Sequence, residues 1–74
     1  MKKLHLTGFF EREGDGFVAL CPELDVASQG DSLDEARANL KEAVELFLET
    51  APAEERERRY EPEVFITRFE AAYA

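Results

Sequence analysis

Carboxylates are the commonest side chains in this 74-residue sequence that are able to do chemistry. Aspartate and glutamate number 17 against 9 lysines and arginines, which gives a formal net charge of −8 at pH 7. Nucleic-acid binding rests on lysine and arginine side chains that neutralise phosphates. The charge balance therefore disfavours direct binding of DNA or RNA.

The acids are concentrated in residues 11–35, where Arg12 is the single base and the local charge is −7. Three interpretations are open: a divalent-metal site, a docking surface for a basic partner, or a solvated rim that keeps a small protein in solution. Metal binding ranks lowest, because the stretch has no D-x-D-x-D-G ligand loop. The docking interpretation rests on five acids, namely Glu11, Glu13, Asp15, Glu23 and Asp25.

Side chains suited to catalysis are few. His5 is the single histidine and has no cysteine, aspartate or serine near it in the sequence, so we expect a strand residue and not a general base. Cys21 is the single cysteine and has no neighbouring cation, so we expect a small apolar residue. Gly14 and Gly16 lack the helix and lysine of a phosphate-binding loop. We therefore predict no catalytic residue, no bound metal and no cofactor.

The apolar pattern predicts the elements that position these side chains. Residues 4–12 alternate with the period of a strand, and residues 13–16 have the glycines of a hairpin loop. Residues 17–21 form an apolar run suited to a buried strand, which Pro22 ends. Residues 26–30 form a weaker third strand.

A helix follows, because Ser32 and Glu35 have the spacing of a capping box. An apolar stripe then repeats at helical spacing, and residues 50–52 close the helix. The stripe consists of Leu33, Ala36, Leu40, Ala43, Val44, Phe47 and Leu48. Residues 53–62 are charged and extend a helix by no more than a turn or two, because Pro62 bars continuation.

Residues 63–70 alternate again and predict a fourth strand. The expected fold is α+β, with the order β-β-β-α-β, and has two layers: a four-stranded sheet in the order 3-2-1-4 with one helix on one face. One domain is expected to span residues 1–74, with no C-terminal DNA-binding domain. No apolar run has the length of a signal-peptide core or a membrane span, so we expect a cytoplasmic protein that does not bind membranes.

One helix covers only one face of such a sheet, and the first and fourth predicted strands carry apolar residues on both faces. An uncovered apolar face indicates an interface, so we predict a homo-oligomer with Phe9, Phe65 and Phe69 at the contact. The alternative is that residues 53–62 or Tyr73 fold over this face.

The middle of the chain contains three motifs in succession: the run Cys21-Pro22-Glu23-Leu24, the segment Ser28-Gln29-Gly30-Asp31-Ser32, and the helix Leu40-Lys41-Glu42-Ala43-Val44-Glu45-Leu46-Phe47-Leu48-Glu49. Together they resemble the HicB-type antitoxin family, and the resemblance covers residues 4 to about 50. It implies a partial ribonuclease H-like fold and an antitoxin that binds and neutralises a small basic RNA-cleaving toxin of the HicA type. The alternative is an oligomeric ligand-binding or scaffold module without a toxin partner.

The resemblance to a ribonuclease H-like fold does not imply a nuclease. Such an enzyme needs a metal-binding carboxylate in the middle of its first strand, and this sequence has Thr7, Gly8 and Phe9 there. We therefore expect a protein that acts by binding.

Overall fold

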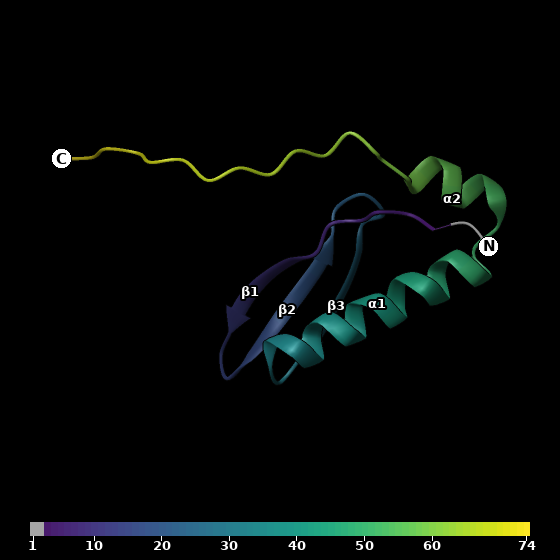
Figure 1. Cartoon of the computed structure of the whole chain (residues 1–74), viewed down its shortest axis with the longest axis horizontal. Helices are drawn as coiled ribbons and strands as arrows, with labels where there is room; N and C mark the ends of the chain where they lie inside the picture. Colours follow the sequence, from purple (N-terminus) through teal and green to yellow (C-terminus); the bar gives the residue numbers. More distant parts are fainter. Residues whose placement is uncertain (1–2) are drawn as a thin grey trace.

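The computed structural model describes residues 3–74, so residues 1 and 2 of the expected domain lie outside the described part. Strands β1 (Phe9–Glu13), β2 (Gly16–Cys21) and β3 (Val26–Gly30) come first in the chain. Helices α1 (Leu33–Thr50) and α2 (Ala53–Arg59) follow them. Figure 1 shows α1 lying along one face of the sheet and α2 beyond the C-terminal end of α1.

The first three strands form an antiparallel meander in the order β1-β2-β3. A two-residue turn joins β1 to β2, and its Gly14 has a φ of 59°, which costs glycine no steric strain. Strand β2 is central. Its Ala19 lies opposite Phe10 of β1 on one side and opposite Ser28 of β3 on the other. The hairpin and the second and third strands are confirmed as the sequence predicts them.

Helix α1 begins where the capping box predicts. The Ser32 hydroxyl accepts a hydrogen bond from the Glu35 backbone N–H at 3.1 Å. The Glu35 carboxylate in turn accepts from the backbone N–H of Asp31 at 3.3 Å, one residue before the cap. These bonds satisfy amide groups that the first turn of a helix otherwise leaves unpaired. Asp34 and Glu35 also place negative charge at the positive end of the helix dipole.

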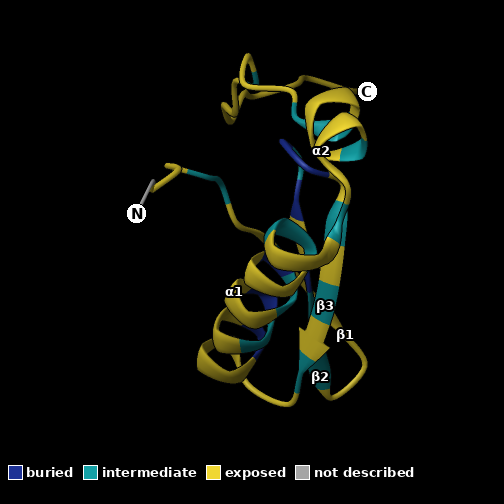
Figure 2. Cartoon of the chain, turned by 90° about the vertical axis from the view of Figure 1, so that its right-hand side faces the viewer, coloured by how far each residue is buried: buried dark blue, intermediate teal, exposed yellow. Residues whose placement is uncertain are grey.

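The core is one thin layer between α1 and the sheet (Figure 2). Ala36, Leu40 and Val44 of the predicted stripe are buried against it. The sheet and the turn after β2 contribute Ala19, Cys21 and Leu24 to the same layer, and Leu24 is fully buried. Leu33 belongs to the predicted stripe but lies exposed at the start of the helix.

Gly30 lets β3 and the first turn of α1 approach each other closely. A β-carbon added at Gly30 would lie 2.4 Å from the backbone nitrogen of Ala36, closer than van der Waals contact allows. The Asn39 side chain donates a hydrogen bond to the backbone carbonyl of Gln29 at 2.8 Å and ties the same two elements together. This close contact sets the distance at which α1 covers the sheet.

The expected four-stranded sheet is wrong. Within residues 3–74 the sheet has three strands, and residues 61–74 form an extended segment that leaves the domain (Figure 1). Alternating side chains make a segment able to pair, but a strand exists only where a neighbour supplies its hydrogen bonds. The fold is therefore α+β with a three-stranded sheet and two helices, and the charged residues 53–59 form α2.

The first strand also begins later than its alternation predicts, at Phe9 and not at residue 4. Residues 3–8 have no regular secondary structure, although Leu6 packs against the core. Neither described helix is long and apolar enough to cross a lipid bilayer.

We expect Gly30→Ala to destabilise the fold by about 1–3 kcal/mol, the range typical of overpacking, because the added methyl group meets backbone that cannot rotate away. Urea unfolding followed by circular dichroism measures this change. Gly14→Asn is the control, since the space around Gly14 is open and asparagine tolerates its positive φ. An unchanged midpoint for Gly30→Ala would contradict the proposed close packing.

Candidate functional site

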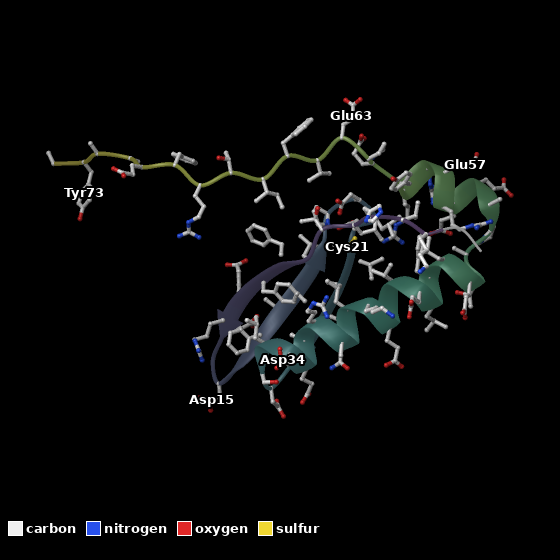
Figure 3. The ribbon with its side chains drawn as sticks, in the orientation of Figure 1. Asp15, Cys21, Asp34, Glu57, Glu63 and Tyr73 are labelled. Carbon is white, nitrogen blue, oxygen red and sulfur yellow. The ribbon has the colours of Figure 1, made fainter. Side chains whose placement is uncertain are left out.

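Carboxylates that are distant in the sequence meet at the hairpin end of the molecule. This end contains the β1–β2 turn, the end of β3 and the first turn of α1. We call its five carboxylates the acidic end: Glu13, Asp15, Asp31, Asp34 and Glu35. Figure 3 shows Asp15 and Asp34 at this same end, with Cys21 at the opposite end of the sheet.

An open hollow of about 430 Å³ lies within the acidic end. Glu13, Asp31 and Glu35 contribute to its wall, with Phe17, Gln29 and Asn39 among the other lining residues. The Arg12 guanidinium lies over the Phe17 ring, 4.7 Å from the ring centroid. Arg12 is the single base within residues 11–35, and this cation–π contact holds its side chain against the sheet. The hollow therefore presents mainly hydrogen-bond acceptors to a ligand.

The predicted acidic rim does not form one surface. Glu11 lies exposed on β1, and Glu13 and Asp15 lie at the hairpin end. Glu23 and Asp25 lie in the turn between β2 and β3, which an antiparallel meander places at the opposite end of the sheet. The structure instead joins Glu13 and Asp15 to the acids at the start of α1.

Glu23 is buried, with 5% of its surface exposed, so its carboxylate does not face a partner. It accepts two hydrogen bonds from Thr7, from the backbone N–H at 3.0 Å and from the hydroxyl at 2.6 Å. The Cys21 thiol also donates to it, at 3.6 Å between sulfur and oxygen. The carboxylate thus fixes the N-terminal segment against the turn that follows β2.

This cluster shifts the pKa values of two groups. Burial alone raises the pKa of Glu23, but the two hydrogen bonds from Thr7 favour the ionised form, and the net pKa lies below the ordinary 4.5. Burial also raises the pKa of the Cys21 thiol, and the adjacent Glu23 carboxylate raises it further. A protonated, buried thiol is a poor nucleophile, which agrees with the structural role that the sequence predicts for Cys21.

Helix α2 holds the same turn from the other side. Arg59 donates hydrogen bonds to the backbone carbonyls of Leu24 at 3.1 Å and Asp25 at 2.6 Å. The Glu61 backbone N–H donates to the Glu23 carbonyl at 2.7 Å. Asp25 has a φ of 54°, a left-handed conformation that aspartate tolerates better than most residues. The backbone carbonyl of Asp25 accepts the hydrogen bond from Arg59, whereas the residue as a whole is exposed to solvent.

The three predicted interface aromatics are exposed but lie on two separate parts of the molecule. Phe9 lies on the sheet face opposite α1, in a cross-strand row with Leu20 and Ala27. Phe65 and Phe69 lie on the extended C-terminal segment. Neither α2 nor Tyr73 covers the outer face: Tyr73 is 97% exposed, and Phe9 retains 44% exposure.

The remaining chemical candidates stay isolated. His5 is exposed in the irregular N-terminal segment. Within residues 3–74, no group of three or more histidine, cysteine, aspartate or glutamate side chains has an arrangement that could hold a metal ion. The acidic end is thus a surface of separate carboxylates.

Sequence reasoning missed two features: the burial of Glu23, and the proximity of the acids at the β1–β2 hairpin to the acids at the start of α1. The burial depends on Thr7, which lies 16 residues away, and no local pattern reports that contact. The meeting of acids follows from topology: in a meander, the first turn and the end of the third strand share one end of the sheet. That signal was available from the predicted strand order.

Two proteins of Synechocystis sp. are similar to this chain. The UPF0150 protein ssl0738 is 45% identical over 49 residues, which cover 64% of this chain and 68% of the relative. The chain belongs to the UPF0150 family. A second UPF0150 protein, ssr1765, is 46% identical over 50 residues, 65% of this chain and 63% of the relative's length.

No family model and no solved structure matches the chain. Neither UPF0150 name states an activity or a binding partner.

We expect Glu23→Gln to destabilise the domain by about 1–3 kcal/mol near pH 7, because hydrogen bonds to a buried charged group are lost or weakened. The folded-state pKa is depressed, so the carboxylate stabilises the fold above its ordinary pKa of 4.5. That stabilisation disappears as the pH falls through the lower folded-state pKa. The difference between wild type and variant should therefore shrink towards acid pH in urea titrations.

Glu49→Gln provides the control, because Glu49 is an exposed glutamate of α1. A difference for Glu23→Gln that stays constant from neutral to acid pH would show that ionisation of Glu23 does not stabilise the fold.

Proposed function

We propose that the chain is a HicB-like antitoxin that acts by binding, and that it neutralises a small basic RNA-cleaving toxin of the HicA type. The resemblance of residues 4 to about 50 to that family suggests this class of partner. The observation that carries the proposal is the convergence of Glu13, Asp31 and Glu35 around one open hollow.

The chemistry of such a toxin explains why this surface suits it. A protein that grips RNA presents lysine and arginine side chains where phosphates bind. Carboxylates at comparable positions on an antitoxin compete for those side chains and exclude the RNA. The acidic end provides hydrogen-bond acceptors from β1, from the β1–β2 turn and from the start of α1. It can therefore contact several basic side chains on the surface of a toxin and not just a single residue.

Charge complementarity acts mainly on the association rate and on specificity. An exposed ion pair contributes only about 0.2–1 kcal/mol, so a single reversal is too weak a test. The acidic end offers exposed acids whose side chains form no hydrogen bond or ion pair within residues 3–74, among them Glu13, Asp15 and Asp34. Glu35 is unsuitable for substitution because it caps α1.

The triple variant Glu13→Lys, Asp15→Lys, Asp34→Lys should slow association with the toxin by at least about tenfold at low salt. The probe is the basic HicA-type protein of about 60–90 residues, one short domain, encoded in a neighbouring reading frame. Stopped-flow fluorescence at ~50 mM and ~500 mM salt measures the rates. The difference should shrink at the higher salt, because the Debye length becomes shorter.

A matched control makes the same change in net charge away from the acidic end. Glu42→Lys, Glu49→Lys, Glu57→Lys alters three exposed acids of α1 and α2. Equal slowing by both triple variants would mean that net charge and not the acidic end steers association. If the toxin is bound at neither salt concentration, or if no such toxin is encoded, the antitoxin proposal fails and the scaffold alternative replaces it.

The protein alone should not cleave RNA. Strand β1 has the exposed Glu11 at its middle, but within residues 3–74 no group of three or more histidine, cysteine, aspartate or glutamate side chains is arranged to hold the metal ions that a ribonuclease H-like site needs. Incubation of the purified chain with Mg²⁺ or Mn²⁺ and labelled single- or double-stranded RNA should leave the RNA intact on a denaturing gel. Cleavage that persists through repurification and is lost in Glu13→Ala or Asp34→Ala would establish an enzyme.

A further inference from the structure

The turn between β2 and β3 binds a guanidinium group that the chain itself supplies. Arg59 of α2 donates hydrogen bonds from Nε to the Leu24 carbonyl at 3.1 Å and from Nη2 to the Asp25 carbonyl at 2.6 Å. The same guanidinium lies over the Phe47 ring of α1, 4.7 Å from the ring centroid. Adjacent acceptors and an aromatic face suit a planar cation with a fixed fork of donors. We call the two carbonyls and the ring the guanidinium site.

The guanidinium site is held in shape by contacts that do not involve Arg59. Leu24 is fully buried, and its backbone N–H donates to the Cys21 carbonyl at 3.3 Å. The φ of 54° at Asp25 is left-handed. Successive carbonyls of a strand point in opposite directions, whereas a left-handed helical conformation brings them to one side. Phe47 packs against the core. We therefore expect the site to persist when Arg59 leaves it.

Arg59 itself has the means to leave. Helix α2 has no buried residue, and the Arg59 side chain retains 30% exposure. The Glu55 carboxylate, one turn earlier on the same helix, lies 3.6 Å from Arg59 Nη1 and offers this arginine an acceptor outside the site. The Glu61 backbone N–H still bonds the Glu23 carbonyl at 2.7 Å, so the guanidinium can move by side-chain rotation while the backbone stays in place.

We propose that the guanidinium site binds an arginine side chain of a partner protein, and that Arg59 occupies the site until the partner displaces it. The occupant in the structure defines the chemistry of the ligand, because the ammonium of lysine has no planar fork of donors. The net charge of −8 favours the approach of a basic protein. The site lies at the opposite end of the sheet from the acidic end, so the inference does not depend on the toxin-binding proposal.

The attachment of Arg59 to the same chain explains why the ligand is part of a protein and not free arginine. A tethered group competes at an effective concentration in the millimolar range. A site that is open in only a fraction of molecules binds its ligand more weakly by that fraction. A partner protein overcomes this competition through contacts outside the site, whereas a variant without Arg59 removes the competition altogether.

The variant Arg59→Ala therefore empties the site of the full-length chain, and N-acetyl-arginine amide is the probe. An NMR titration follows the backbone amides of Asp25 and Val26, because each shares a peptide group with one of the two accepting carbonyls. The probe should shift both signals to saturation in Arg59→Ala. In wild type the same shifts should require a concentration at least about tenfold higher.

Arg58→Ala is the matched control variant, because it removes the same charge from the same helix and leaves Arg59 in place. The Arg58 side chain is 74% exposed, and the variant should titrate as wild type does. N-acetyl-lysine amide is the matched control probe and should not bind. Equal binding of the two probes to Arg59→Ala, or equal affinities of Arg59→Ala and wild type for the arginine probe, overturns the proposal.

Two further measurements test the ring and the displacement. Adding Phe47→Leu to Arg59→Ala should weaken binding of the arginine probe, because leucine offers no π face, and an unchanged affinity would refute the site as described. In wild type, the Arg59 Nε–H signal should move towards that of a free side chain as the probe binds, because the Leu24 carbonyl no longer accepts from it. Amide shifts without this movement would mean that Arg59 is not displaced, and would refute the exchange.

Circular dichroism shows whether Arg59→Ala is folded. If it is not, the arginine probe should restore the helical signal, because a ligand that binds only the folded state stabilises it. Failure of the probe to restore the signal, or equal restoration by N-acetyl-lysine amide, would contradict the proposal in that case.

Discussion

The turn between β2 and β3 is the contact on which the rest of this small structure depends. Its Leu24 is fully buried, and its Glu23 carboxylate binds the N-terminal segment through Thr7. Its backbone carbonyls accept hydrogen bonds from Arg59 and Glu61, so α2 and the start of the extended segment 61–74 are fixed at the same place. Three parts of the chain that are distant in sequence thus share one short turn.

This arrangement also separates the two ends of the molecule by function. The turn end holds the structural contacts and has its carboxylate buried, whereas the hairpin end has exposed acids around an open hollow. A buried carboxylate whose two oxygens both accept hydrogen bonds within the fold is not available to a partner. The exposed acids therefore account for the proposed recognition, and the buried one accounts for order in the N-terminal segment.

Local patterns predicted the elements that local interactions form. The capping box at Ser32 and Glu35, the hairpin glycine at residue 14 and the stripe of α1 each depend on residues a few positions apart. The errors concern distant partners. Residues 63–70 have the alternation of a strand, but pairing depends on a neighbour that the segment does not specify. Glu23 has the character of a surface acid until Thr7 is placed beside it.

The position of β2 between two edge strands determines how the domain opens. Because β1 and β3 pair only with β2 within the described sheet, any opening that separates β2 also removes the surface on which α1 packs. Amide protons of β2 and of the buried face of α1 should thus exchange with solvent only through global unfolding. Residues 62–74 form no backbone hydrogen bond to the rest of the described chain, so their amide protons should exchange almost as in a free peptide. Amide exchange would accordingly divide this chain into one cooperative unit and a C-terminal segment that opens independently of it.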